Sequence, residues 1–307
     1  MGVRMYVGWT QVASDSELTG EVLPVDIAGR RLVAVYGDSG WVVCDGTCPH
    51  RGAHLGYGGR VDGSVVVCPF HGHRVHLGDD RPALFSVTRY STLHAAGGLF
   101  VLLDDACETG LSRRLLALSR THFVKPAFQR TLSIPAEYVI ENVVDADHFA
   151  AVHALTRRPR LSVFEDEAGV LRVEGSFEMV RPNKWQVEEG ADTTARARFS
   201  AEVFSPTVVV SELGSADAPN VVITAATPTA EGGCVARVTV ALPRQRASGA
   251  PTVRELSSLV SGSRTAFDQD TVIWDHLDTS VTPKYTEGDE LVRAYRAFCQ
   301  RFVSVGR

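Results

Sequence analysis

The segment CPHRGAHLGYGGRVDGSVVVCPFH, residues 48–71, contains four potential metal ligands arranged in two pairs. Cys48 and His50 form a C-x-H pair, and Cys68 and His71 form a C-x-x-H pair, with seventeen residues between His50 and Cys68. The glycines of this segment allow the backbone to turn tightly and to approach a bound group closely. Each pair therefore offers one thiolate and one imidazole from a short loop.

Two kinds of metal centre bind two cysteines and two histidines. In a Rieske [2Fe-2S] centre, one iron binds both cysteines and the other binds both histidines. A tetrahedral zinc ion also accepts these ligands, but zinc fingers pair C-x₂₋₄-C with H-x₃₋₅-H, so each half carries one ligand type. The mixed pairs of this sequence favour the iron–sulfur cluster, with the ligands Cys48, His50, Cys68 and His71.

The same segment resembles the N-terminal domain of Rieske non-haem iron oxygenases, in which CPHRGA is followed by CP(Y/F)HGW. This sequence has CPHRGA and CPFHGH, so His73 stands where the family has Trp. We expect the change to leave ligation intact and to alter packing and polarity near the cluster; His73 and His76 are interpreted as solvated loop residues. Respiratory Rieske proteins carry an extra cysteine in each ligand loop, and both are missing here, which disfavours a subunit of a membrane complex.

A second group of polar residues, Asn142, Asp145, His148 and His153, follows the spacing N-x₂-D-x₂-H-x₄-H. On a helix, Asp145 and His148 lie one turn apart on one face. His148 and His153 are about 140° apart on an ideal helix, so both reach one metal only if the helix bends or loosens between them. The spacing resembles the segment that supplies two ligands to the mononuclear iron of Rieske oxygenases. Asn142 is interpreted as a helix cap, with contact to the open iron face as the alternative.

A mononuclear Fe(II) oxygenase site needs a carboxylate as its third ligand and open positions for O₂ and substrate. In the family this carboxylate comes from a helix far downstream, commonly as an acidic or amide residue followed by Asp. The segment 264–278 offers four candidates, Asp268, Asp270, Asp275 and Asp278. Gln269-Asp270 matches the family best, and Asp268 would point about 200° away from Asp270 on an ideal helix. We therefore predict Asp270 as the third ligand.

The pattern of short apolar runs and turns predicts an α+β fold. Residues 1–105 read as short strands with glycine-rich turns and indicate an all-β Rieske domain. Residues 106–130 are expected to form a connection, with a short helix at Leu111–Leu118. Residues 131–307 contain strand candidates, a helix candidate at Leu256–Phe267 and an amphipathic helix at 287–305, and the resemblance implies a helix-grip catalytic domain. The strand candidates there are Leu161–Glu165, Val170–Phe177, Thr194–Phe204, Thr207–Glu212, Asn220–Thr227 and Gly233–Leu242.

Composition excludes several classes of protein. The 44% apolar and 22% charged content is ordinary for a soluble domain. A net charge of −5 and the lack of a basic run argue against a nucleic-acid partner. The apolar runs are too short to span a membrane, and the first residues lack the apolar core of a secretory signal. The cysteines outside the ligand pairs are interpreted as free thiols in a cytoplasmic protein.

The resemblance implies the oxygenase component of a multicomponent enzyme. Such a component uses O₂ and supplied electrons to hydroxylate, demethylate or desaturate a small organic substrate. A chain of this length resembles the homotrimeric monooxygenases and demethylases more than the arene dihydroxylases. In the family, electrons pass between subunits through a carboxylate, which by position is Asp145, linking His71 of one subunit to His148 of the next. A carboxylate that accepts the imidazole N–H would orient the ring.

Electrons must come from another protein, because no dinucleotide or flavin motif is present. We expect a separate NAD(P)H-dependent reductase, with or without a ferredoxin. The alternative function is a Rieske electron carrier whose second domain binds a partner and carries no iron. The two differ in iron content, at three irons per chain for an oxygenase and two for a carrier.

Overall fold

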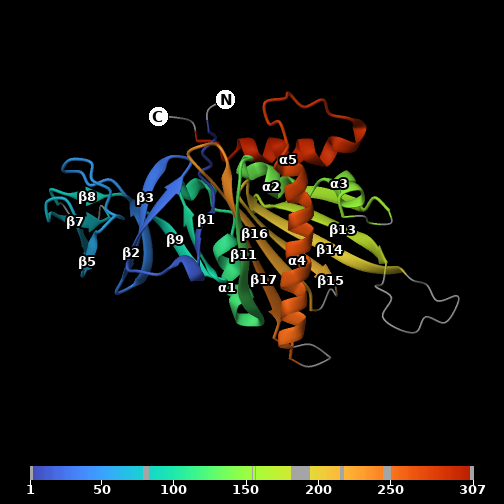
Figure 1. Ribbon diagram of the computed structural model, residues 1–307, viewed down its shortest axis with the longest axis horizontal. Helices are drawn as coiled ribbons and strands as arrows, with labels where there is room; N and C mark the ends of the chain where they lie inside the picture. The colour runs from blue at the N-terminus through green and yellow to red at the C-terminus, as the bar shows by residue number, and fades with distance from the viewer. Residues whose placement is uncertain are drawn as a thin grey trace.

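The computed structural model describes residues 3–78, 83–153, 155, 157–180, 194–214, 218–244 and 250–304 (Figure 1). A β-rich N-terminal part and a larger C-terminal part lie side by side along the longest axis, and the long helix α4 (Val253–Trp274) crosses the C-terminal sheet. The predicted α+β architecture, an all-β domain followed by a sheet with a long helix, is confirmed.

The N-terminal domain consists of two small sheets. The six-stranded sheet has the order β1-β10-β9-β4-β3-β2 and the four-stranded sheet the order β5-β6-β7-β8. The strands are β1 (Thr10–Ser14), β2 (Val22–Ile27), β3 (Arg30–Gly37), β4 (Gly40–Asp45), β5 (Arg60–Asp62), β6 (Val65–Val67), β7 (Arg74–Leu77), β8 (Ser86–Val87), β9 (Arg89–Ala95) and β10 (Gly98–Leu102). Valines of β3, β6 and β7 pack with Cys48 and Cys68 in one apolar core. The ligand loops are therefore anchored in a packed interior.

The C-terminal domain contains a seven-stranded antiparallel sheet of order β11-β17-β16-β15-β14-β13-β12. Its strands are β11 (His122–Leu132), β12 (Arg160–Glu165), β13 (Leu171–Val180), β14 (Thr194–Ser205), β15 (Val208–Gly214), β16 (Asn220–Pro228) and β17 (Cys234–Pro243). Alternate residues face opposite sides, since Val222 packs towards α4 while Ile223 packs towards α1 (Leu111–Thr121) and the N-terminal domain. The helices α2 (Ala136–Glu141), α3 (Ala146–Ala151), α4 and α5 (Glu290–Gln300) lie on one face.

Two segments differ from the sequence prediction. Residues 122–130, expected to belong to a connection, form most of β11, which pairs with β17 along its whole length. Pro126 and an irregularity of the register beside it hide the strand pattern, and an edge strand is where proline is tolerated. The closing helix is shorter than predicted, because a 3₁₀ turn (Glu287–Asp289) precedes α5. Its apolar stripe, including Tyr295, is buried as predicted.

Buried polar contacts join the two domains. The Arg237 guanidinium on β17 donates to both carboxylate oxygens of Glu17, at 2.7 and 2.9 Å. The hydroxyls of Ser205 and Thr207 both donate to the backbone carbonyl of Trp9, at 2.6 and 2.7 Å. Since such groups are costly to bury unpaired, these contacts fix the orientation of the domains.

Helices long and apolar enough to cross a membrane were sought among the described residues, and none was found.

Candidate metal centres

The two ligand loops of the N-terminal domain have the same backbone design. In the first, the N–H of Cys48 donates to the carbonyl of Ala53, and the N–H of Gly52 donates back to the carbonyl of Cys48. In the second, Cys68 and Gly72 repeat this pattern, with the Cys68 N–H donating to the carbonyl five residues later. Both glycines have positive φ, at 76° and 71°, which side chains other than hydrogen disfavour. The repeated turn brings two short loops face to face.

The four side chains of these loops fit a two-iron cluster. The Nδ1 atoms of His50 and His71 lie 3.2 Å apart, close to the separation of about 3.3 Å for two nitrogens on one tetrahedral ion at about 2.0 Å. The thiols of Cys48 and Cys68 are buried, and burial raises the pKa of Cys48, with the neighbouring Cys68 adding to the increase. No three of the four ligand atoms converge within 4.8 Å, as a single zinc would require. The geometry thus separates an imidazole pair from a thiolate pair.

The interpretation of His73 and His76 as solvated loop residues is wrong for His76, which lies in a strand, and only partly right for His73, which lies in the loop before β7 but is half-buried. The ring of His73 packs against His50, with centroids 4.3 Å apart, and against Phe85 at 4.8 Å. His76 lies in β7, paired with Val65 of β6. His73 therefore takes a packing position beside a proposed ligand.

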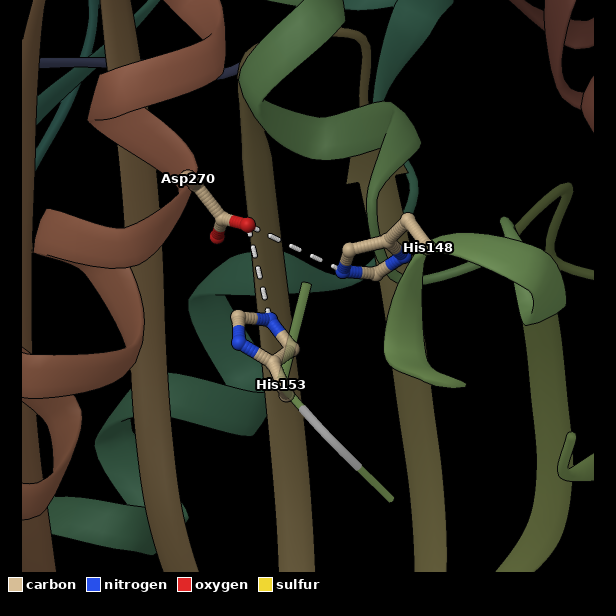
Figure 2. A group of neighbouring side chains, drawn as sticks. All are labelled: His148, His153 and Asp270. Atoms are coloured by element: carbon tan, nitrogen blue, oxygen red, sulfur yellow. Dashed lines mark ion pairs between the residues drawn. The ribbon is translucent and has the colours of Figure 1, made fainter. Parts of the chain in front are cut away.

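The second centre brings together His148, His153 and Asp270 (Figure 2). One ligand atom of each lies within 4.8 Å of the other two, and Asp270 Oδ1 is 4.0 Å from His148 Nε2 and 3.4 Å from His153 Nε2. The helix α3 ends at Ala151, before His153, so the predicted loosening between the histidines is present. Two elements 116 residues apart in sequence, the end of α3 and α4, thus converge on one point.

Hydrogen bonds turn both imidazoles towards this point. His148 Nδ1 lies 2.7 Å from the backbone carbonyl oxygen of Asp145, and His153 Nδ1 lies 3.0 Å from Oε1 of Gln269. Both partners are acceptors, so each Nδ1 carries a proton and each Nε2 presents a lone pair. Burial lowers the pKa of His148, which favours the neutral form of its ring. Burial also raises the pKa of Asp270 to about 6, against the opposing influence of His153 and Asn142.

Three nearby residues differ from expectation or refine it. Asn142 is the C-cap residue of α2, and its side chain also hydrogen-bonds the Asp270 carboxylate, which the sequence interpretation did not include. Asp145 caps α3, because its Oδ1 accepts the N–H groups of Asp147 and His148 at 3.0 and 3.2 Å. It is the backbone carbonyl of Asp145, not its carboxylate as expected, that accepts the His148 ring N–H. Asp268 points elsewhere, 3.4 Å from the Arg130 guanidinium.

Comparison with known proteins decides the family. Residues 8–83 match the Rieske [2Fe-2S] domain, and residues 116–303 match the 3-Ketosteroid 9alpha-hydroxylase C-terminal domain. The chain belongs to the Rieske oxygenase family. As a member, this Rieske oxygenase has a [2Fe-2S] domain, and its C-terminal domain type implies a mononuclear iron site, for which the His148, His153 and Asp270 cluster offers a suitable donor set.

Relatives of this Rieske oxygenase include enzymes with different reactions. It is 25% identical to a probable 3-ketosteroid-9-alpha-monooxygenase, oxygenase component, of Rhodococcus rhodochrous, over 92% of this chain and 76% of that protein. It is 30% identical to the Bombyx mori cholesterol 7-desaturase nvd, over 48% of this chain and only 35% of that protein. The crystal structure of dicamba monooxygenase bound to 3,6-dichlorosalicylic acid shares the fold, with a TM-score of 0.73, 16% identity and 96% of each chain covered.

Proposed function

We propose that this Rieske oxygenase is the oxygenase component of a multicomponent system. It would use O₂ and externally supplied electrons to hydroxylate, demethylate or desaturate a small organic substrate. The observation that carries the proposal is the convergence of His148, His153 and Asp270 in a chain that also holds the paired cysteine and histidine loops. An electron carrier without iron in its second domain would have no need of the site formed by His148, His153 and Asp270, so that alternative is not favoured.

The proposal assigns a ligand role to seven residues. Cys48, His50, Cys68 and His71 would hold the [2Fe-2S] cluster, and His148, His153 and Asp270 would hold Fe(II). When bound, the cluster supplies single electrons and the mononuclear iron supplies open positions for O₂ and substrate. The protein contributes two imidazoles turned by hydrogen bonds and a carboxylate held by Asn142. The domain boundaries would lie near residues 105 and 121, because β11 already belongs to the C-terminal sheet.

A head-to-tail homotrimer is part of the proposal. The ligand loops and α3 lie well apart along the longest axis, so the two centres of one chain are separated (Figure 1). At one end, the exposed Phe70 packs against the exposed His71, with ring centroids 3.8 Å apart, and Tyr57 of the same segment is also exposed. At the other, Val272 and Ile273 are exposed on α4 near Asp270 in sequence. Two different apolar patches suit a heterologous interface, which forms a ring when the rotation between neighbours closes. This arrangement would place His71 of one subunit near the centre of the next.

Asp145 would link the two centres across that interface. Its Oδ1 is used in capping α3, which leaves Oδ2 for the His71 ring of a neighbouring subunit. Its backbone carbonyl meanwhile orients His148, so one residue would contact both centres. We expect Asp145→Asn to retain both metals and to lose most coupled turnover. Unchanged product formation with the native electron donor would contradict this role.

The proposed function requires another protein as electron donor. This partner would be a separate NAD(P)H-dependent reductase, with or without a ferredoxin. The net charge of −5 supports a protein without a nucleic-acid partner. We also propose a cytoplasmic location, because none of the six cysteines, all of which lie among the described residues, forms a disulfide, as expected in a reducing compartment.

Iron content and oxygen consumption test the proposed function together. The oxygenase should contain about three irons per chain, two in the cluster and one at the second centre. His148→Ala should lose about one of these irons and all substrate-dependent O₂ uptake, while the visible spectrum of the cluster persists. The substrate panel should begin with 3-ketosteroids and sterols, after the names of two relatives, and include small aromatic acids. Retention of full iron content and turnover in His148→Ala would refute the assignment.

A further inference from the structure

We infer that Gln269 is a positioning residue that fixes the tautomer and direction of the His153 ring; this inference rests on the proposed iron site. The amide oxygen of Gln269 lies 3.0 Å from His153 Nδ1. The opposite nitrogen of the same ring, Nε2, lies 3.4 Å from Asp270 Oδ1. Two consecutive residues of α4 therefore act on opposite edges of one imidazole.

His153 needs such a partner because its own backbone does not hold it. The helix α3 ends at Ala151 and is capped at Val152, so His153 lies beyond the last helical turn. His148 differs, since it lies inside α3 and donates to a backbone carbonyl of its own first turn. A backbone carbonyl survives any side-chain substitution, whereas the acceptor for His153 is a side chain from a distant helix. The orientation of His153 is thus the more dependent of the two.

The chemistry of Gln269 suits this task. Its amide oxygen is a neutral acceptor, so it requires a proton on Nδ1 without adding charge beside the buried Asp270. The Nε2 lone pair is then the only one that the ring offers to a metal. Outer hydrogen bonds of this kind typically change metal affinity by about 10–100-fold when they are removed.

Substitution at position 269 separates positioning from packing. Gln269→Leu keeps the approximate size and removes the acceptor, and Gln269→Glu restores an acceptor. A matched control is Gln300→Leu, the same change at an exposed position on α5. The probe is Fe(II) itself, titrated against a chelator into protein whose cluster is loaded and whose second centre has been stripped. The visible spectrum of the cluster and the melting temperature are recorded for each variant.

We expect Gln269→Leu to bind Fe(II) about 10–100-fold more weakly, with an unchanged cluster spectrum, and Gln269→Glu to stay within about threefold of the wild type. Gln300→Leu should match the wild type. Equal Fe(II) affinity of Gln269→Leu and wild type would overturn the inference, as would equal losses in the Leu and Glu variants. If the wild type itself takes up no Fe(II) at the second centre, the proposed function fails first, and the two failures are therefore distinguishable.

Discussion

In the metal-free protein, the buried carboxylate of Asp270 should lower the free energy of unfolding. Asp270→Asn should restore the lost free energy. Asp270 is 9% exposed, and burial raises the pKa of its carboxyl group from 3.8 to about 6. A carboxyl group whose pKa is higher in the folded than in the unfolded chain lowers the free energy of unfolding when it ionises. The loss begins above the pKa of the unfolded chain and is complete above the pKa of the folded protein. The metal-free protein should therefore become less stable between about pH 4 and pH 6.

The size of the effect follows from the two pKa values. The linkage relation gives a cost of about 1.5 kcal/mol at about pH 5 and about 3 kcal/mol at about pH 8. Asparagine is uncharged throughout this range, and its amide oxygen can still accept from Asn142. Asp270→Asn should thus exceed the wild type in unfolding free energy by these amounts, although it loses a proposed metal ligand.

Urea unfolding measures this difference directly. Wild type and Asp270→Asn are stripped of iron at the second centre and unfolded at several pH values between about 5 and 8. Asp268→Asn makes the same chemical change on a more exposed face of α4, where loss of the pair with Arg130 should cost less than about 1 kcal/mol. A pH-independent difference, or an Asp270→Asn variant less stable than the wild type at pH 8, would refute the reasoning.

Three further substitutions test other parts of the structure. Glu17→Gln should lower the free energy of unfolding in urea by about 2 kcal/mol at neutral pH. Burial tends to raise the pKa of Glu17, but Arg237 holds it below its usual value, so the effect of the substitution should shrink in acid. Arg296→Met should lower the free energy of unfolding by about 3 kcal/mol in thermal unfolding, because it leaves buried Glu141 unpaired. Burial raises the pKa of Glu141, so this loss of stability should grow from pH 5 to pH 8 as the carboxyl group ionises. Gly56→Ala should lower the cluster content measured by visible absorbance, because an added Cβ would lie 2.6 Å from the backbone of β2.

Control variants distinguish these specific effects from the general effect of introducing a substitution. Gly20→Ala introduces a Cβ that meets no atom within 4 Å, so its cluster content should equal that of the wild type. Arg293→Met removes a more exposed arginine of the same helix as Arg296 and should change stability little. A Gly56→Ala protein with full cluster content would show that β2 can move away from the ligand loop.

Residue type and spacing, together with the family resemblance, led to the predicted ligands, whose roles stay a prediction. Cys48 and His71 lie in short loops, where a metal centre would constrain both residue type and separation, so such a pattern can be recognised in the sequence. The position of His153 beyond the end of α3 could also be predicted, because the helical angle between the two histidines is incompatible with a continuous helix. The family pattern pointed to Asp270, and the helical angle showed only that Asp268 and Asp270 cannot both face one point. The structure places the two residues on different sides of α4.

Contacts between distant elements could not be predicted in this way. The hydrogen bond of Gln269 and that of Asn142 depend on how α4 is rotated against α2 and α3, which no spacing within either segment encodes. The strand β11 was missed because Pro126 and its register irregularity interrupt the alternation. The packing of His73 was missed because its ring contacts Phe85, twelve residues later, beyond the reach of a local pattern.

The buried junction at Trp9 limits how such enzymes can be recombined. Its carbonyl receives two hydroxyls from the C-terminal sheet, and Arg237 reaches Glu17 across the same junction. A chimera cut near residue 105, where the chain leaves the first domain, would bring a foreign β1 against Ser205 and Thr207. Unless the donor domain offers a matching backbone carbonyl and acid, the hybrid would bury unsatisfied groups. Exchange of the N-terminal domain between relatives should therefore succeed only when the contacting residues of the C-terminal sheet are exchanged with it.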